Sequence, residues 1–172
     1  MPIKGFIEFR LNRCKRLTAR SLKKITSNYP KLQFLGFSFI QAKSEDLDCL
    51  LNCPNLVYLE ALGFPITDRE LEILGRLTKL EYVYLTDVRC SKDGLKHLYA
   101  WKKLDKCTLI NSKLDPAWVE DLQAHLPGAT ILSKQAVPTE VNDMFGMFLD
   151  QKADPMREIN LVKPQDPKVP LK

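Results

Sequence analysis

The chain has 172 residues, of which 45% are hydrophobic and 27% charged, with a formal net charge of +5. This length suits one domain, and the sequence has no apolar run of about 18 residues for a membrane-spanning helix and no uninterrupted apolar stretch of the kind that opens a secretory signal peptide. Five cysteines, an odd number, do not suit a secreted disulfide framework, so we expect a reducing compartment, the cytoplasm or nucleus.

The basic residues concentrate at the N-terminal end. Residues 1–31 contain nine Lys or Arg against Glu8 alone, whereas residues 32–132 contain 11 basic and 14 acidic side chains. A basic, acid-poor beginning is also typical of a mitochondrial presequence, which makes a mitochondrial location the alternative. The basic residues do not alternate with aromatic ones as in nucleic-acid-binding modules. We therefore expect no nucleic acid, and an acidic protein partner that contacts Arg10 and Arg13.

Apolar residues recur along the chain with the spacing L-x-x-L-x-L, which predicts a series of strands. In chain order they are Phe6, Phe9, Leu11; Leu32, Leu35, Phe37; Leu56, Leu59, Ala61; Leu80, Val83, Leu85; and Leu104, Cys107, Leu109. The second to fifth copies are 24 residues apart, and the first precedes the second by 26. Ala129 and Leu132 are expected to continue the column in a closing strand.

A short helix is predicted after each of these five strands. Each helix follows a residue that can accept a hydrogen bond from a free backbone N–H; these are Thr18, Ser44, Thr67, Ser91 and Asp115. Thr67 with Glu70 forms a capping box, and Pro116 suits a first helical position. Inward-facing apolar pairs follow in each helix, from Leu22 and Ile25 to Val119 and Leu122.

Strand and helix positions that recur together resemble the leucine-rich-repeat family. The resemblance implies an α/β fold, a right-handed solenoid with a parallel β-sheet on its concave face and short helices on its convex face. Five repeats and the closing strand would occupy residues 1–132. The segment NRCKRLTARSLKKITSNYPKL is similar to the cysteine-containing repeats of F-box substrate adaptors, which implies ubiquitin-ligase components as partners, although the sequence contains no F-box.

Residues 133–172 leave the repeat pattern and form a C-terminal extension. Val141, Met144, Phe145, Phe148 and Leu149 share one face of a helix expected over 139–150. The following residues are rich in proline and favour an extended arm. The helix is expected either to cap the last repeat or to dock in a groove of a partner.

No arrangement of residues predicts an enzyme. His97 and His125 fall on separate helices, and the sequence has no phosphate-binding loop, dinucleotide motif or nucleophile elbow. Cys49 and Cys53 lack a second Cys or His pair for zinc. We therefore expect no catalytic residues, no metal and no cofactor.

The candidate binding site is the concave strand face. Phe34, Tyr58 and Tyr82 form one column across the strands, with Tyr84 beside it, and the surrounding acidic residues are Glu60, Glu81, Asp87 and Asp105. Interface centres are rich in aromatic side chains, so the sequence predicts a non-enzymatic protein–protein interaction module whose acidic residues favour a basic partner segment. The alternative is a structural or assembly subunit of a larger complex, held through the basic first repeat and the C-terminal arm.

Overall fold

A computed structural model of the chain describes residues 8–11, 18–38 and 44–134. Arg13, the helix expected over 139–150 and the proline-rich arm lie outside these residues. The chain divides into two compact units, Met1–Gln135 and Ala136–Lys172, and the described residues all belong to the first.

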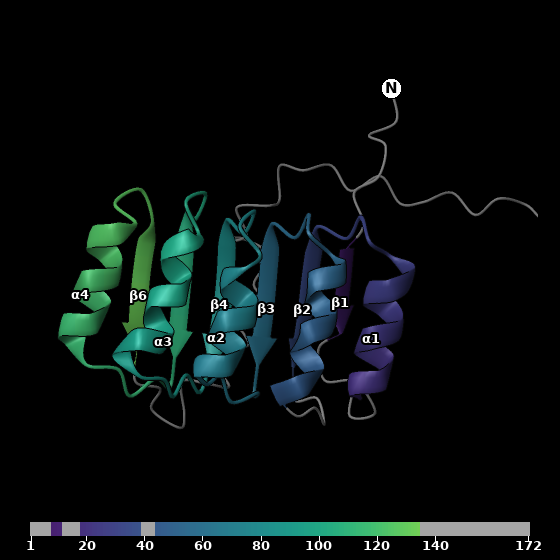
Figure 1. Cartoon of the computed structure of the whole chain (residues 1–172), viewed down its shortest axis with the longest axis horizontal. Helices are drawn as coiled ribbons and strands as arrows, with labels where there is room; N and C mark the ends of the chain where they lie inside the picture. Colours follow the sequence, from purple (N-terminus) through teal and green to yellow (C-terminus); the bar gives the residue numbers. More distant parts are fainter. Residues whose placement is uncertain (1–7, 12–17, 39–43, 135–172) are drawn as a thin grey trace, which may run out of the picture. The chain divides into compact units, whose positions relative to one another are not determined.

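The described part of the first unit is an α/β fold, in which a six-stranded parallel sheet alternates with helices (Figure 1). In chain order the elements are β1 (Glu8–Leu11), α1 (Ala19–Asn28), β2 (Phe34–Ser38), the 3₁₀ helix η1 (Ser44–Asn52), β3 (Tyr58–Leu62), α2 (Asp68–Gly75), β4 (Tyr82–Thr86), α3 (Lys92–Lys96), the 3₁₀ helix η2 (His97–Ala100), β5 (Lys106–Ile110), α4 (Pro116–His125) and β6 (Thr130–Lys134). The closing strand therefore continues two residues past the predicted end of the repeats at 132.

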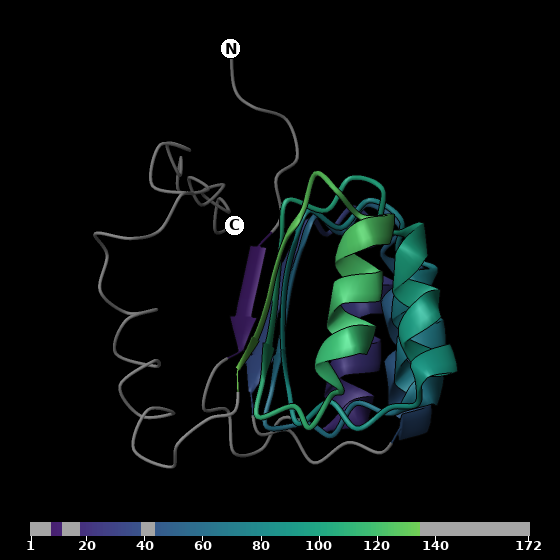
Figure 2. The same cartoon turned by 90° about the vertical axis from the view of Figure 1, so that its left-hand side faces the viewer.

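Strand order in the sheet follows chain order, and every neighbouring pair is parallel. Parallel neighbours need a crossover connection, and the helices supply it. All the described helices lie against one face of the sheet (Figure 2). We call the other face, against which no described helix packs, the helix-free face.

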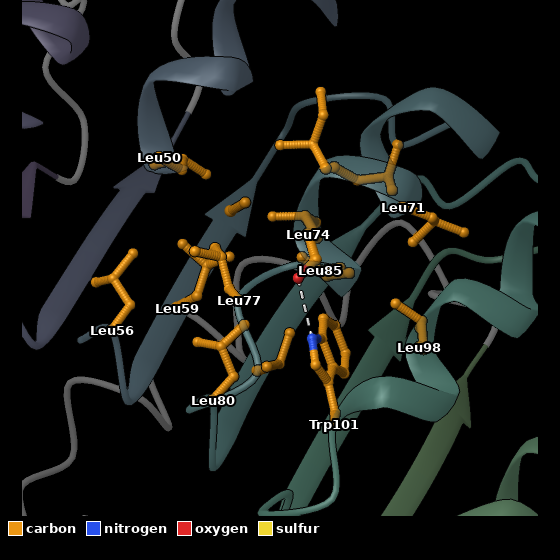
Figure 3. Packing of buried hydrophobic residues seen from close by; sticks show 14 of the residues in the cluster. Leu50, Leu56, Leu59, Leu71, Leu74, Leu77, Leu80, Leu85, Leu98 and Trp101 are labelled. Atoms are coloured by element: carbon orange, nitrogen blue, oxygen red, sulfur yellow. Dashed lines mark hydrogen bonds between the residues drawn. The ribbon is translucent and has the colours of Figure 1, made fainter. Parts of the chain in front are cut away.

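The hydrophobic core fills the space between the sheet and the helices. Successive strand residues point to opposite faces, and the inward column Leu35, Leu59, Val83 and Cys107 is fully buried. Trp101, at the end of η2, is also fully buried among leucines, and its indole N–H donates a 3.0 Å hydrogen bond to the carbonyl oxygen of Leu74 (Figure 3). Burying each such side chain stabilises the fold by about 1.5–3 kcal/mol, so these columns hold consecutive strand–helix units together.

The predicted helix starts are confirmed. Thr18, Thr67, Ser91 and Asp115 are the N-cap residues of α1 to α4, and Ser44 begins η1. The Thr67 backbone N–H donates to the Glu70 carboxylate at 2.7 Å, as the capping box requires.

The turns after β3, β4 and β5 contain a feature that the sequence analysis missed. Gly63, Asp87 and Asn111 have φ values of 66°, 55° and 52°, and they are 24 residues apart. Glycine adopts this left-handed region freely, and Asp and Asn adopt it more readily than other side chains. The chain therefore turns in the same way at the end of each of these three strands.

The predicted orientation of the closing strand is wrong by one residue. Ile131 pairs with Cys107 and Leu132 pairs with Thr108, so Ile131, not Leu132, takes the inward position. Ile131 accordingly packs against the core. A shift of one residue moves every side chain of a strand to the other face, which places Leu132 on the helix-free face.

None of the helices in residues 8–11, 18–38 and 44–134 is both long enough and apolar enough to cross a membrane.

Candidate functional site

The helix-free face is built from two rows of side chains that run across the sheet. The first row contains Glu8, Phe34, Tyr58, Tyr82, Lys106 and Thr130, and the second contains Arg10, Gly36, Glu60, Tyr84, Thr108 and Leu132. The register predicted from the 24-residue period is therefore confirmed, apart from Leu132. Parallel strands lie about 4.8 Å apart, which brings side chains of the same row into contact.

The aromatic side chains of the two rows contact each other. The rings of Phe34 and Tyr58 stack with centroids 3.8 Å apart and an interplanar angle of 7°. The ring of Tyr84 meets Tyr58 at 5.5 Å and 37°. Phe34, Tyr58, Tyr82 and Tyr84 thus form the aromatic cluster that the sequence predicted.

Two members of this cluster are more buried than the prediction requires. Phe34 is 1% exposed and Tyr84 is 7% exposed, although neither belongs to the core between sheet and helices. Phe34 lies between the Tyr58 ring on one side and the Arg10 guanidinium on the other, whose central carbon is 4.6 Å from the ring centroid. The accessible part of the cluster is therefore Tyr58 and Tyr82, which are half-buried.

Glu60 was expected at the acidic rim and is instead 7% exposed. Its carboxylate accepts a 3.2 Å hydrogen bond from the Tyr58 hydroxyl. Burial, followed by the charge of Glu60 and this hydrogen bond, raises the pKa of Tyr58 far above its usual range. Glu60 therefore orients the Tyr58 hydroxyl within the cluster and has little surface left for a partner.

Tyr82 lies beside the acidic residues that stay accessible. A hydrogen bond from its hydroxyl to Asp105 raises the pKa of Tyr82, with smaller contributions from burial and from the charges of Asp105 and Glu81. Asp105 is exposed and Glu81 is half-buried. Tyr58, Tyr82, Glu81 and Asp105 together form what we call the tyrosine–acid strip.

Asp87 does not belong to this strip. It follows the C-terminal end of β4, whereas Tyr82 begins the strand, and five residues of strand span about 16 Å. Its carboxylate accepts a hydrogen bond from the Asn111 side chain across the left-handed turns described above. Asp87 therefore links two neighbouring turns, a role that its charge alone did not indicate.

Leu62 and Ile110 are apolar residues of the helix-free face that the sequence analysis missed. They end β3 and β5, and each is 3% exposed while lying outside the core cluster. Between them, Thr86 accepts a 2.6 Å hydrogen bond from the backbone N–H of Gly63. Strand alternation from Tyr58 would have found them, because they share its parity.

The expected basic site is only partly within the described residues. Arg10 is exposed and forms an ion pair with Glu8 on the same strand. Arg10 contacts Phe34 as well, so the basic N-terminal strand reaches the end of the aromatic cluster.

The described residues offer little for catalysis or for metal binding. They contain no group of three His, Cys, Asp or Glu side chains that could hold a metal ion. Burial raises the pKa of the Cys107 thiol to about 12 and that of Cys53, with help from neighbouring Cys49, to about 11. Such thiols are protonated at neutral pH and are poor nucleophiles.

The two predicted histidine positions differ in their surroundings. His125 stacks on the Tyr99 ring with centroids 3.8 Å apart, and its Nδ1 lies 2.8 Å from the Asp121 carbonyl oxygen. Asp93, which was expected to pair with His97, instead pairs with Lys96 at 2.6 Å. These contacts join consecutive helices and hold neither histidine near the other.

The sequence matches no protein-family model, and a search of the curated proteins returned no match.

Proposed function

We propose that this chain is a leucine-rich-repeat protein, a right-handed solenoid that acts as a non-enzymatic protein–protein interaction module. Three features with the same 24-residue period support the assignment: the apolar strand positions, the helix N-caps from Thr67 to Asp115, and the left-handed turn residues from Gly63 to Asn111. A single unit of this kind cannot bury its apolar side, so the stacked units act as one domain.

The observation that carries the proposed function is the tyrosine–acid strip on the helix-free face. Tyr58 and Tyr82 are half-buried on rigid strands, and each hydroxyl is already oriented by a carboxylate, Glu60 or Asp105. Tyrosine in this setting presents a large apolar area and loses little side-chain freedom on binding. The strip is therefore suited to form the centre of an interface.

The charges beside the strip favour a partner segment that carries lysine or arginine. Glu81 and Asp105 flank Tyr82, and Lys106 is the one basic neighbour in its row. The chain contains an internal example of the expected contact, because the Arg10 guanidinium stacks on Phe34 at the other end of the cluster. Cations bind tyrosine faces by the same attraction.

The partner class follows from the surface, and its identity does not. Ubiquitin-ligase components and the other subunits of a larger complex are the two groups that the sequence resemblance and the basic end suggest. Affinity purification with identification of the co-purifying chains separates them, because ligase subunits would support the first group and a stable stoichiometric assembly the second.

The function is then tested with the identified partner. Replacing Tyr58 and Tyr82 by alanine should weaken binding by more than about 2 kcal/mol, as expected for residues at an interface centre, without unfolding the chain. The matched control replaces Lys92 and His97, which are exposed on the helical side, and should leave the affinity unchanged. Native affinity of the tyrosine double variant would contradict the proposal.

A further inference from the structure

We propose a second interaction surface, at the N-terminal end of the sheet, that binds an acidic protein. It consists of an apolar centre, Phe9, Ile25 and Tyr29, with Arg20, Lys23, Lys24 and Lys31 around it, and we call it the basic end. It is distinct from the tyrosine–acid strip and does not depend on the function proposed for that strip.

The apolar centre is incompletely covered by the rest of the fold. Phe9 and Ile25 pack against the core and are only half-buried. Tyr29 is 40% exposed and is the one exposed large hydrophobic residue among those the structure describes. Its ring contacts Phe9 at 4.8 Å with an interplanar angle of 56°, so the aromatic pair joins the end of α1 to β1.

These residues lie at an end of the sheet that no described element covers. β1 is the first strand of the sheet, and α1 is the helix at the same end (Figure 1). The neighbouring segment η1 and the residue after it reach α1 through Ser27 and Thr26: Asn52 donates to the Ser27 hydroxyl at 3.5 Å, and the Cys53 thiol approaches the Thr26 carbonyl at 3.6 Å. Ile25 is 200° from Ser27 around a helix of 3.6 residues per turn, which turns it away from η1.

The charge around this centre has one sign. Arg20, Lys23, Lys24 and Lys31 are all exposed, and α1 contains no acidic residue. The helices α2, α3 and α4 each contain aspartate or glutamate. The nearest described carboxylate on β1, Glu8, is already paired with Arg10.

An acidic protein fits this combination better than another polyanion. Protein interfaces have an apolar, aromatic centre and a charged rim, and the rim charges set the preferred partner and the rate of encounter. A bare phosphate chain would use the lysines and arginines and would gain little from Ile25 or the Phe9–Tyr29 pair. The partner therefore carries glutamate or aspartate around apolar side chains.

The test uses the full chain and two fluorescent peptides that contain the same number of glutamates. In one peptide leucine and phenylalanine separate the glutamates, and in the other glycine and serine do. Fluorescence anisotropy should show about tenfold tighter binding of the first peptide, which corresponds to about 1.4 kcal/mol. A single-stranded DNA oligonucleotide serves as the nucleic-acid arm and should bind more weakly than the first peptide.

Three variants decide whether the basic end is the site. Tyr29→Ser and the double variant Lys23→Glu/Lys24→Glu change exposed side chains, and each should weaken the leucine–phenylalanine peptide about tenfold. The matched control, Lys103→Glu/Lys113→Glu, reverses two exposed lysines elsewhere and should bind normally. Equal affinity for the two peptides, tighter binding of the oligonucleotide, or unchanged binding of the Tyr29→Ser variant would overturn the proposal.

Discussion

The Trp101 side chain offers a direct test of how the strand–helix units are held together. It is fully buried, and its indole N–H donates to the Leu74 carbonyl oxygen at 3.0 Å. Trp101→Phe removes this hydrogen bond, which contributes about 1 kcal/mol. The smaller ring also leaves a cavity of about 40 Å³, which costs about 1 kcal/mol. The Leu74 carbonyl keeps the Leu77 backbone N–H as a donor at 3.0 Å, so no larger penalty for a stranded acceptor is added.

Urea denaturation followed by circular dichroism measures this loss. We expect the free energy of unfolding to fall by about 2 kcal/mol with an unchanged dependence on urea. Trp118→Phe is the matched control, because Trp118 is the other tryptophan of the chain and is half-buried on α4. It should cost less than about 1 kcal/mol. A Trp101→Phe variant as stable as the control would refute the reasoning that Trp101 locks η2 onto α2.

Two further predictions concern the helical side and the tyrosine hydroxyls. Gly94→Ala would place Cβ 2.0 Å from Asp68 Oδ1 and should lower the free energy of unfolding by about 1–3 kcal/mol, whereas Gly128→Ala, which meets no atom within 4 Å, should not lower it in the same urea titration. A hydrogen bond to Asp121 raises the pKa of Tyr99 to about 12 from 10.0; because the raised pKa favours the protonated hydroxyl in the folded state, its contribution to stability is fully present below pH 10 and is lost as the pH rises through about 12. Phenolate absorbance should show an ionisation near pH 12 that Tyr99→Phe removes, and an unaltered titration would contradict this assignment.

The strand register and the helix starts could be predicted from the sequence because both follow local rules. Apolar residues 24 positions apart must share the same face of successive strands, and this rule placed Tyr58 opposite Tyr82. N-cap preferences are equally local, and they located Ser91 and Asp115. The closing strand failed since Leu132 was matched by its residue type, although the 24-residue period from Cys107 leads to Ile131.

The details of the candidate site could not be predicted, because they depend on which side chains meet across strands. The stacking of Arg10 on Phe34 and the bond from Tyr58 to Glu60 arise from diagonal and same-strand neighbours whose rotamers no sequence pattern specifies. These contacts bury two of the residues that alternation had placed on an accessible face. Asp87 was assigned to the site by charge, whereas its left-handed backbone makes it a turn residue.

The central claim is that the helix-free face, through Tyr58 and Tyr82, binds a protein partner. The most direct measurement is the partner's footprint, obtained from NMR chemical-shift changes of the labelled chain when the partner is added. The account predicts the largest changes at Tyr58, Tyr82 and Asp105, and small ones on α2, α3 and α4. A footprint confined to those helices, with the strand residues unperturbed, would contradict it.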